Sequence, residues 1–252
     1  MSIGPLTGAI EIDLKGKKLK SILFVALFDP IIYFIGETVG IGNTTASASK
    51  SGAFLACIPA ASLVASSAIL HKRARRIQTL GILITLSEVL LTAFAAGMNR
   101  TSLSATRYLF LAIAVVSYAL YSVFVEKAEG FSSMEITYVM IAAGALVFGL
   151  LAIGEARLHG TISSLALLPF SNAPFLAAVL YQGIGCSILA FFLSNVTIAK
   201  IGVNRTASFI GLSTVISILA GALLLGESFA ALQIVGAAII LIGVYAANSR
   251  RA

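Results

Sequence analysis

Charged side chains are scarce in this sequence. Only 11% of the 252 residues are Asp, Glu, Lys or Arg, whereas 59% are hydrophobic, and the mean hydropathy is +1.02. So high an apolar share with so little charge is typical of membrane proteins. The composition therefore excludes an ordinary soluble domain before any motif is considered.

Cysteine and histidine are also rare, with two of each. Cys57 and Cys186 both lie within apolar runs, where a structural disulfide is not expected, and His71 and His159 lie at run ends or in loops. Because no Cys, His and Asp cluster appears at ligand spacing, we expect no metal site and no cofactor.

Motifs of common enzymes are missing as well. A phosphate-binding loop of the form GxxxxGK[ST] is absent, so ATP is not expected to be the direct energy source. The sequence shows no GxSxG motif, and its Ser and His residues do not stand at spacings that would make a nucleophile–base pair. We therefore do not expect an enzyme.

What the sequence does contain is a series of long apolar runs. A helix needs about 20 apolar residues to cross a hydrocarbon core of roughly 30 Å. The expected spans are about 21–41, 52–70, 77–97, 107–125, 134–154, 173–198, 206–225 and 230–247. We interpret residues 155–172 as a loop with a short interfacial helix. The fold class predicted is an all-α integral membrane protein with about eight transmembrane helices.

The net charge of +7 sits in short blocks between these runs, a pattern that sets topology and does not indicate a nucleic-acid partner. With the N-terminus inside, 13 of the 17 Lys and Arg residues lie on the cytoplasmic side and four on the other. The basic leader, 1–20, and the tail, 248–252, are therefore both predicted to be cytoplasmic, in a bacterial inner membrane or a plasma membrane. The expected partners are the lipid bilayer and a small-molecule solute.

An internal repeat is suggested when residue n is placed over residue n+155. Ser62 then faces Ser217, and Gln78 faces Gln233, in segments whose predicted orientations are opposite. Inverted repeats with a site at the midplane are a common construction of secondary transporters. The alternative is that two Ala/Leu-rich helical hairpins simply look alike.

Several short motifs, in this order and spacing, resemble EamA-type permeases of the drug/metabolite transporter superfamily. They are Tyr33-Phe34-Ile35-Gly36-Glu37, Ile58-Pro59, Ser117-Tyr118-Ala119-Leu120-Tyr121, Leu-Leu-Leu-Gly-Glu at 223–227 and Ile234-Val235-Gly236. The resemblance implies two inverted five-helix repeats. This chain would hold three helices of the first, 21–97, and all five of the second, 107–247, and would lack the family's first two helices.

Glu37 is the sharpest candidate for a functional residue. A carboxylate within a membrane span is costly and usually faces a cavity or a partner. It could bind a cationic or zwitterionic solute or take up a coupling proton; alternatively, it reaches headgroups from the outer boundary of the span. When residue n is instead aligned with residue n+158 of the same sequence, Glu37 is aligned with Asn195. Gly36 and Gly40, which are spaced as GxxxG beside it, also favour close helix contact.

Asp29 and Glu88 are further candidates for proton coupling. Asp29 stands next to Pro30, and the alternative is a structural kink pair. Glu88 is an isolated carboxylate in its span and could instead pair with another polar group of the bundle.

The other cavity candidates are hydroxyl, aromatic and amide side chains within the spans. They are Tyr33, Ser117, Tyr121, Tyr181, Gln182, Ser187 and Asn195. Ser187, Ser194 and Asn195 are spaced by seven and eight residues, which predicts one shared helical face. Such groups suit a small amphipathic solute, although they could equally form interhelical hydrogen bonds worth roughly 0.6 kcal/mol each.

These features and the resemblance together predict a secondary transporter of a small metabolite, amino acid or drug-like solute, working by alternating access. The alternative is a truncated family member that does not transport and acts as a membrane subunit or is inactive. The two missing helices favour that alternative, because they help to wall the cavity in the family. A homodimer could close the cavity in their place.

Overall fold

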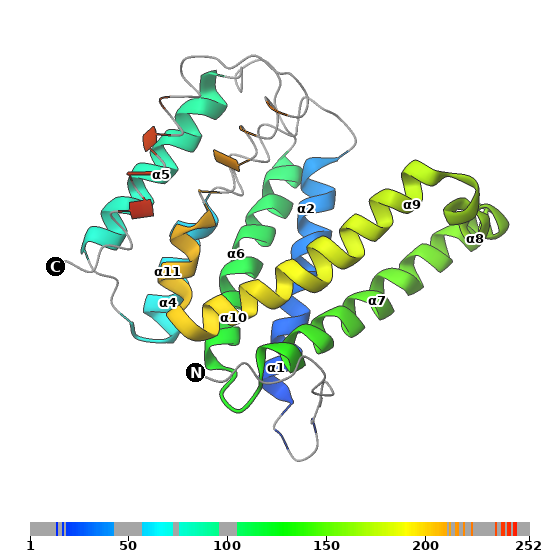
Figure 1. Ribbon diagram of the computed structural model, residues 1–252, viewed down its shortest axis with the longest axis horizontal. Coiled ribbons are helices and arrows are strands. Elements are labelled where there is room, and N and C mark those ends of the chain that lie inside the picture. Colours follow the sequence, from blue (N-terminus) through cyan, green and yellow to red (C-terminus); the bar gives the residue numbers. More distant parts are fainter. Residues whose placement is uncertain are drawn as a thin grey trace.

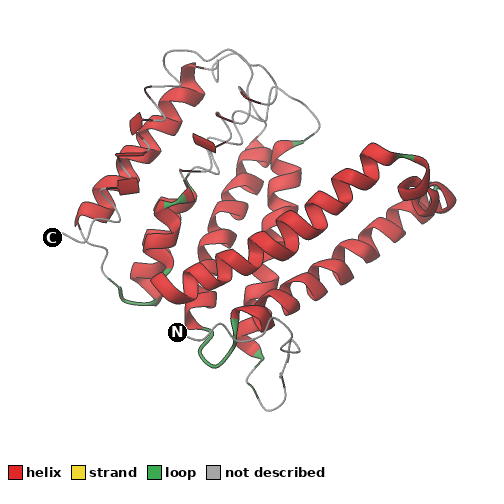
Figure 2. Cartoon of the chain, in the orientation of Figure 1, coloured by secondary structure: helices red, strands yellow, loops and turns green. Residues whose placement is uncertain are grey.

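The computed structural model describes residues 19–42, 57–72, 76–95 and 105–210, together with scattered positions on either side, such as Lys17. All regular structure in this part of the chain is helical (Figure 2). Four helices are long and apolar enough to cross a membrane: Lys20–Ile41, Ala105–Lys127, Ser133–Leu158 and Ala173–Ile201. The all-helical class is confirmed, and four of the expected spans appear where the apolar runs predict them.

The first span is interrupted near its middle. It consists of α1 (Lys20–Ala26), the π-helical segment η1 (Leu27–Ile32) and α2 (Tyr33–Ile41). Asp29 leaves the helical conformation, with φ −141° and ψ 117°, just before Pro30, which has no N–H to continue the hydrogen-bond ladder. A Cβ added to Gly144 of α7 (Ser133–Leu158) would lie 2.9 Å from Pro30 Cγ, so α7 packs closely on this kink.

The helix α6 (Ala105–Lys127) lies at the centre of the bundle, and α1, α2, α4 and α10 all pack against it (Figure 1). Its contact with α2 is close. A Cβ on Gly36 would lie 2.8 Å from the Phe110 carbonyl oxygen, and one on Gly40 would lie 2.6 Å from Leu111 Cγ. The close approach expected from the GxxxG spacing is therefore confirmed.

The helices α4 (Ile58–Ile69) and α5 (Arg76–Ala95) occupy the second and third apolar runs. Both α6 and the short α11 (Val203–Ser208) pack against α4. The last two expected spans, 206–225 and 230–247, fall largely outside the described residues. The count of eight helices and the inverted repeat thus stay predictions.

The fourth long span crosses one face of the bundle (Figure 1). It is formed by α9 (Ala173–Leu180), the π-helical η2 (Tyr181–Ala190) and α10 (Phe191–Ile201). It is joined to α7 through α8 (Ile162–Ser171), a helix in the segment where a short one is expected. The far ends of α7 and α9, joined by α8, reach beyond the other helices (Figure 1). No residue of α9 or η2 is buried by the described residues.

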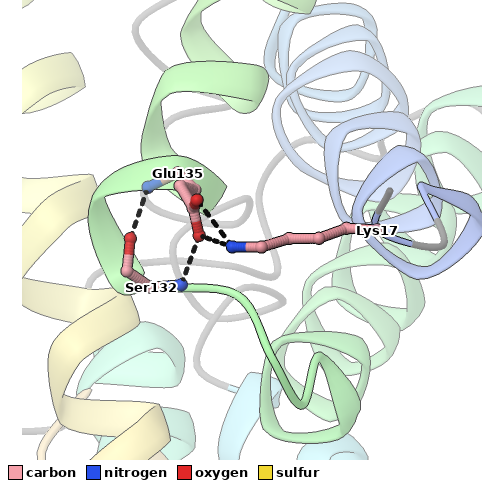
Figure 3. Close-up of polar contacts among 3 residues, drawn as sticks. All are labelled: Lys17, Ser132 and Glu135. Atoms are coloured by element: carbon pink, nitrogen blue, oxygen red, sulfur yellow. Dashed lines mark hydrogen bonds and ion pairs between the residues drawn. The ribbon is translucent and has the colours of Figure 1, made fainter. Parts of the chain in front are cut away.

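Lys17 is joined to the start of α7 by an ion pair. Lys17 Nζ lies 2.7 Å from Glu135 Oε1 and 2.9 Å from Oε2, and 5.3 Å from the ring centroid of Phe131. Glu135 also forms a capping box with Ser132: its Oε2 accepts from Ser132 N at 2.7 Å, and its own N–H donates to Ser132 Oγ (Figure 3). The N-terminal segment and the α6–α7 loop therefore meet at one end of the bundle.

A second ion pair joins other segments at the helix ends. Lys72, which follows α4, pairs with Glu126 near the end of α6, and Glu126 Oε2 accepts a 2.7 Å hydrogen bond from the Val203 N–H at the start of α11. Lys72, the end of α6 that carries Lys127, and the segment 200–205 thus come together, as expected if these basic residues share one side of the membrane. Which side that is remains a prediction.

Candidate functional site

A group of buried and half-buried polar side chains lies between the first span, α6, α7 and α10. We call this group the polar core; it comprises Asp29, Tyr33, Glu37, Tyr118, Tyr121, Thr137, Ser194 and Asn195.

Asn195 of α10 is the hub of the polar core. Its side chain is fully buried, and its Oδ1 accepts a 2.7 Å hydrogen bond from the Tyr121 hydroxyl of α6. Its Nδ2 donates to Thr137 Oγ1 at 2.9 Å and contacts Met140 Sδ at 3.4 Å, both on α7. Thr137 can accept from Asn195 because its own hydroxyl donates to the Ser133 carbonyl at 2.7 Å. One amide therefore ties three helices together.

Three tyrosines continue the polar core from Asn195 towards α2. The rings of Tyr121 and Tyr118 have centroids 5.4 Å apart, and those of Tyr118 and Tyr33 are 5.7 Å apart; both pairs are edge-to-face. The Tyr33 hydroxyl then donates a 3.1 Å hydrogen bond to Glu37 Oε1. An unbroken chain of contacts therefore connects Glu37 with Asn195, the two residues that the n+158 register pairs.

Asp29 lies at the kink of the first span, close to the tyrosines. Its side chain is only 2% exposed, and its Oδ1 has no hydrogen-bond partner among the described residues. It is within electrostatic reach of Glu37 and Tyr118. A buried carboxyl oxygen without a partner is costly, and such groups in membrane spans are usually functional.

The structure thus brings together Tyr33, Glu37, Tyr121 and Asn195, with Asp29 beside them. Ser117 is buried on α6, one turn before Tyr121. Glu88 belongs to α5, but its side chain lies outside the described residues.

The remaining candidates are not part of this group. Tyr181 is 69% exposed, and Gln182 is exposed as well. Ser187 is half-buried and donates to the Gln182 carbonyl at 2.9 Å. All three lie in η2, where π-helical i→i+5 bonding replaces the regular α-helical spacing from which the shared face with Asn195 is expected.

Tyr118, Thr137 and Met140 belong to the site, although sequence reasoning does not single them out. Tyr118 and Tyr121 are three residues apart, so helical spacing alone could have placed both on one side of α6. Nothing in the spacing of Thr137 and Met140 shows that α7 turns this side towards Asn195, because helix rotation depends on packing.

Apolar helical spans around a buried polar core define a polytopic membrane protein. Residues 105–249, more than half of the chain, match the EamA-like transporter family, so the chain belongs to that family. It is also 29% identical over 244 residues to the protein described as "Uncharacterized transporter YcxC" of Bacillus subtilis (strain 168). That similarity covers 96% of this chain and 77% of the relative. The resemblance seen in the sequence is confirmed, and the protein is an integral membrane protein of a transporter family.

Proposed function

We propose that the protein is a secondary transporter that moves a small solute past the polar core by alternating access. The observation that carries this function is the continuous set of contacts from Glu37 through three tyrosines to Asn195, inside an otherwise apolar bundle. A carboxylate, aromatic faces and an amide suit a small cationic or zwitterionic solute with apolar parts, such as an amino acid or a drug-like amine.

The hydrogen bonds of the polar core supply a route from solute binding to helix movement. A donor group of the solute would compete with the Tyr33 hydroxyl for Glu37 and with the Tyr121 hydroxyl for Asn195. Loss of the Tyr121–Asn195 bond weakens the attachment of α10 to α6, so the solute would favour a different arrangement of the helices. Glu37 would either bind the cationic group directly or exchange a proton with it.

The orientation of the chain in its membrane is inferred from the positions of its Lys and Arg residues. The basic segments that meet at one end of the bundle favour a cytoplasmic position for that end, with both termini inside, in a bacterial inner membrane or a plasma membrane. A homodimer, in which a second copy would help to wall the polar core, is part of this proposal.

Transport is tested by reconstituting the purified chain in proteoliposomes and following a pool of labelled amino acids and small metabolites. Saturable uptake above that of protein-free liposomes is the expected result. Correctly inserted protein that moves none of them would contradict transport by this chain alone and would favour a non-transporting membrane subunit.

A further inference from the structure

A polar cavity lies at the end of the bundle where the ion pair Lys72–Glu126 is found. It has a volume of about 320 Å³, and none of its lining residues belongs to the polar core. Its walls come from the C-terminal part of α4, the start of α5, the end of α6 and the turn between α10 and α11, which meet at one end of the bundle (Figure 1). A cavity of this size holds a small metabolite.

Two buried polar atoms of this cavity are unsatisfied. Ser66 is fully buried, and its Oγ has no hydrogen-bond partner in the part of the chain that the structure describes. The same is true of the buried Oδ1 of Asn204. Both residues line the cavity. Since the large majority of buried polar atoms in proteins are hydrogen-bonded, two unsatisfied atoms on residues that line one cavity favour a polar ligand.

The charged residues that line the cavity indicate the charge of the ligand. Glu126 is neutralised by Lys72, and it also accepts from the Val203 N–H. Arg205 then adds one positive charge to the lining. The guanidinium and the Ser66 hydroxyl can donate to an anionic group, whereas Asn204 Oδ1 can only accept. A matching ligand therefore carries a carboxylate or phosphate together with a nearby ammonium or hydroxyl group.

We propose that this cavity binds the anionic end of a small amino acid or hydroxy acid, with the carboxylate at Arg205 and Ser66 and the neighbouring donor at Asn204. The identity of the ligand rests on the proposed function, because it would be the transported solute held at one end of its route. An aminophospholipid headgroup carries the same anionic group and ammonium, so the test separates a free solute from a lipid.

The test is equilibrium dialysis of the full chain, purified in detergent, against labelled L-alanine, L-serine and L-lactate in turn. Saturable binding is expected for the wild type, with affinity lowered about tenfold in Arg205→Gln, since a charge-assisted hydrogen bond is lost. Ser66→Ala and Asn204→Ala change no charge and should each weaken binding by about threefold to tenfold. Arg157→Gln is the matched control, because Arg157 is exposed on α7 and does not line the cavity.

Phospholipid that co-purifies with each variant is quantified in parallel. A phosphatidylethanolamine or phosphatidylserine molecule retained by the wild type and by Arg157→Gln, but lost from Arg205→Gln, supports the site and makes the headgroup its ligand. If neither solute nor lipid binds, or if binding is the same in all cavity variants, the cavity holds only solvent and the inference is wrong. Binding is measured without flux, so solute binding in a protein that does not transport would reject the proposed function and leave the site standing.

Discussion

The Tyr121 hydroxyl lies 2.7 Å from Asn195 Oδ1 and donates a hydrogen bond that joins α6 to α10. Both side chains are almost completely buried, with exposed fractions of 1% and 0%. Asn195 also holds Thr137 of α7, so this pair lies where three helices meet. In lipid such bonds are worth only roughly 0.6 kcal/mol each on average. They can therefore be broken during a transport cycle at small energetic cost.

Glu37→Gln tests the charge of the polar core. Glutamine keeps an oxygen that can accept from the Tyr33 hydroxyl, so the packing at this point should survive while the negative charge is lost. We expect flux of a cationic or zwitterionic solute to fall to background, and the amount of protein in the membrane to stay at the wild-type level. Glu155→Gln, at an exposed carboxylate of α7, is the control and should transport normally. Wild-type flux in Glu37→Gln would show that this carboxylate has no part in transport.

Gly36→Ala tests the close contact of α2 with α6. The added Cβ would lie 2.8 Å from a backbone oxygen of Phe110, so the two helices must separate. Overpacking of this kind lowers the free energy of unfolding by about 1–3 kcal/mol. Reversible unfolding in mixed micelles measures the change. Gly149→Ala is the matched control, because its new methyl group meets nothing within 4 Å, and it should be neutral or slightly stabilising.

The ion pair between Lys17 and Glu135 should contribute measurably to stability, because the Glu135 side chain is only 4% exposed. We expect Glu135→Ala to destabilise the protein more than Lys17→Ala, since Glu135 also serves the capping box with Ser132. A double-mutant cycle on these two substitutions should give a coupling energy of about 1 kcal/mol. If the destabilisations caused by the two substitutions simply added, the contact of Lys17 with Glu135 would contribute nothing to stability.

Impermeant thiol labelling tests the orientation of the helices. In a variant with Cys57 and Cys186 replaced by Ser, single cysteines are placed at the exposed positions Lys127, Lys200 and Arg157. We expect Arg157→Cys to react from outside intact cells and the other two to react only after the cells are opened, because α7 carries the chain across the membrane. Labelling of Lys127→Cys in intact cells would reverse the predicted orientation.

Much of the fold follows directly from the sequence. The lengths of the apolar runs predict four spans that the structure describes, and the GxxxG spacing predicts the contact of α2 with α6. These features are local in the chain, so residue type and spacing are enough to find them.

The site is only partly predictable, because it depends on how the helices rotate and pack. The sequence singles out Glu37, Tyr33, Tyr121 and Asn195 as candidates, yet no spacing shows that α7 turns Thr137 and Met140 towards Asn195. Contacts between distant segments are hidden for the same reason. Lys72 and Glu126 are 54 residues apart, and nothing in either local sequence links them.

Solute flux in Tyr121→Phe tests the central claim most directly. The substitution removes one hydroxyl and leaves the Asn195 Oδ1 without its donor, which costs between about 0.6 and 1.7 kcal/mol in a membrane bundle. In proteoliposomes we expect flux about tenfold below that of the wild type, whereas Tyr138→Phe, at an exposed tyrosine of α7, should transport normally. Equal flux in both variants and the wild type would show that the solute does not pass the polar core.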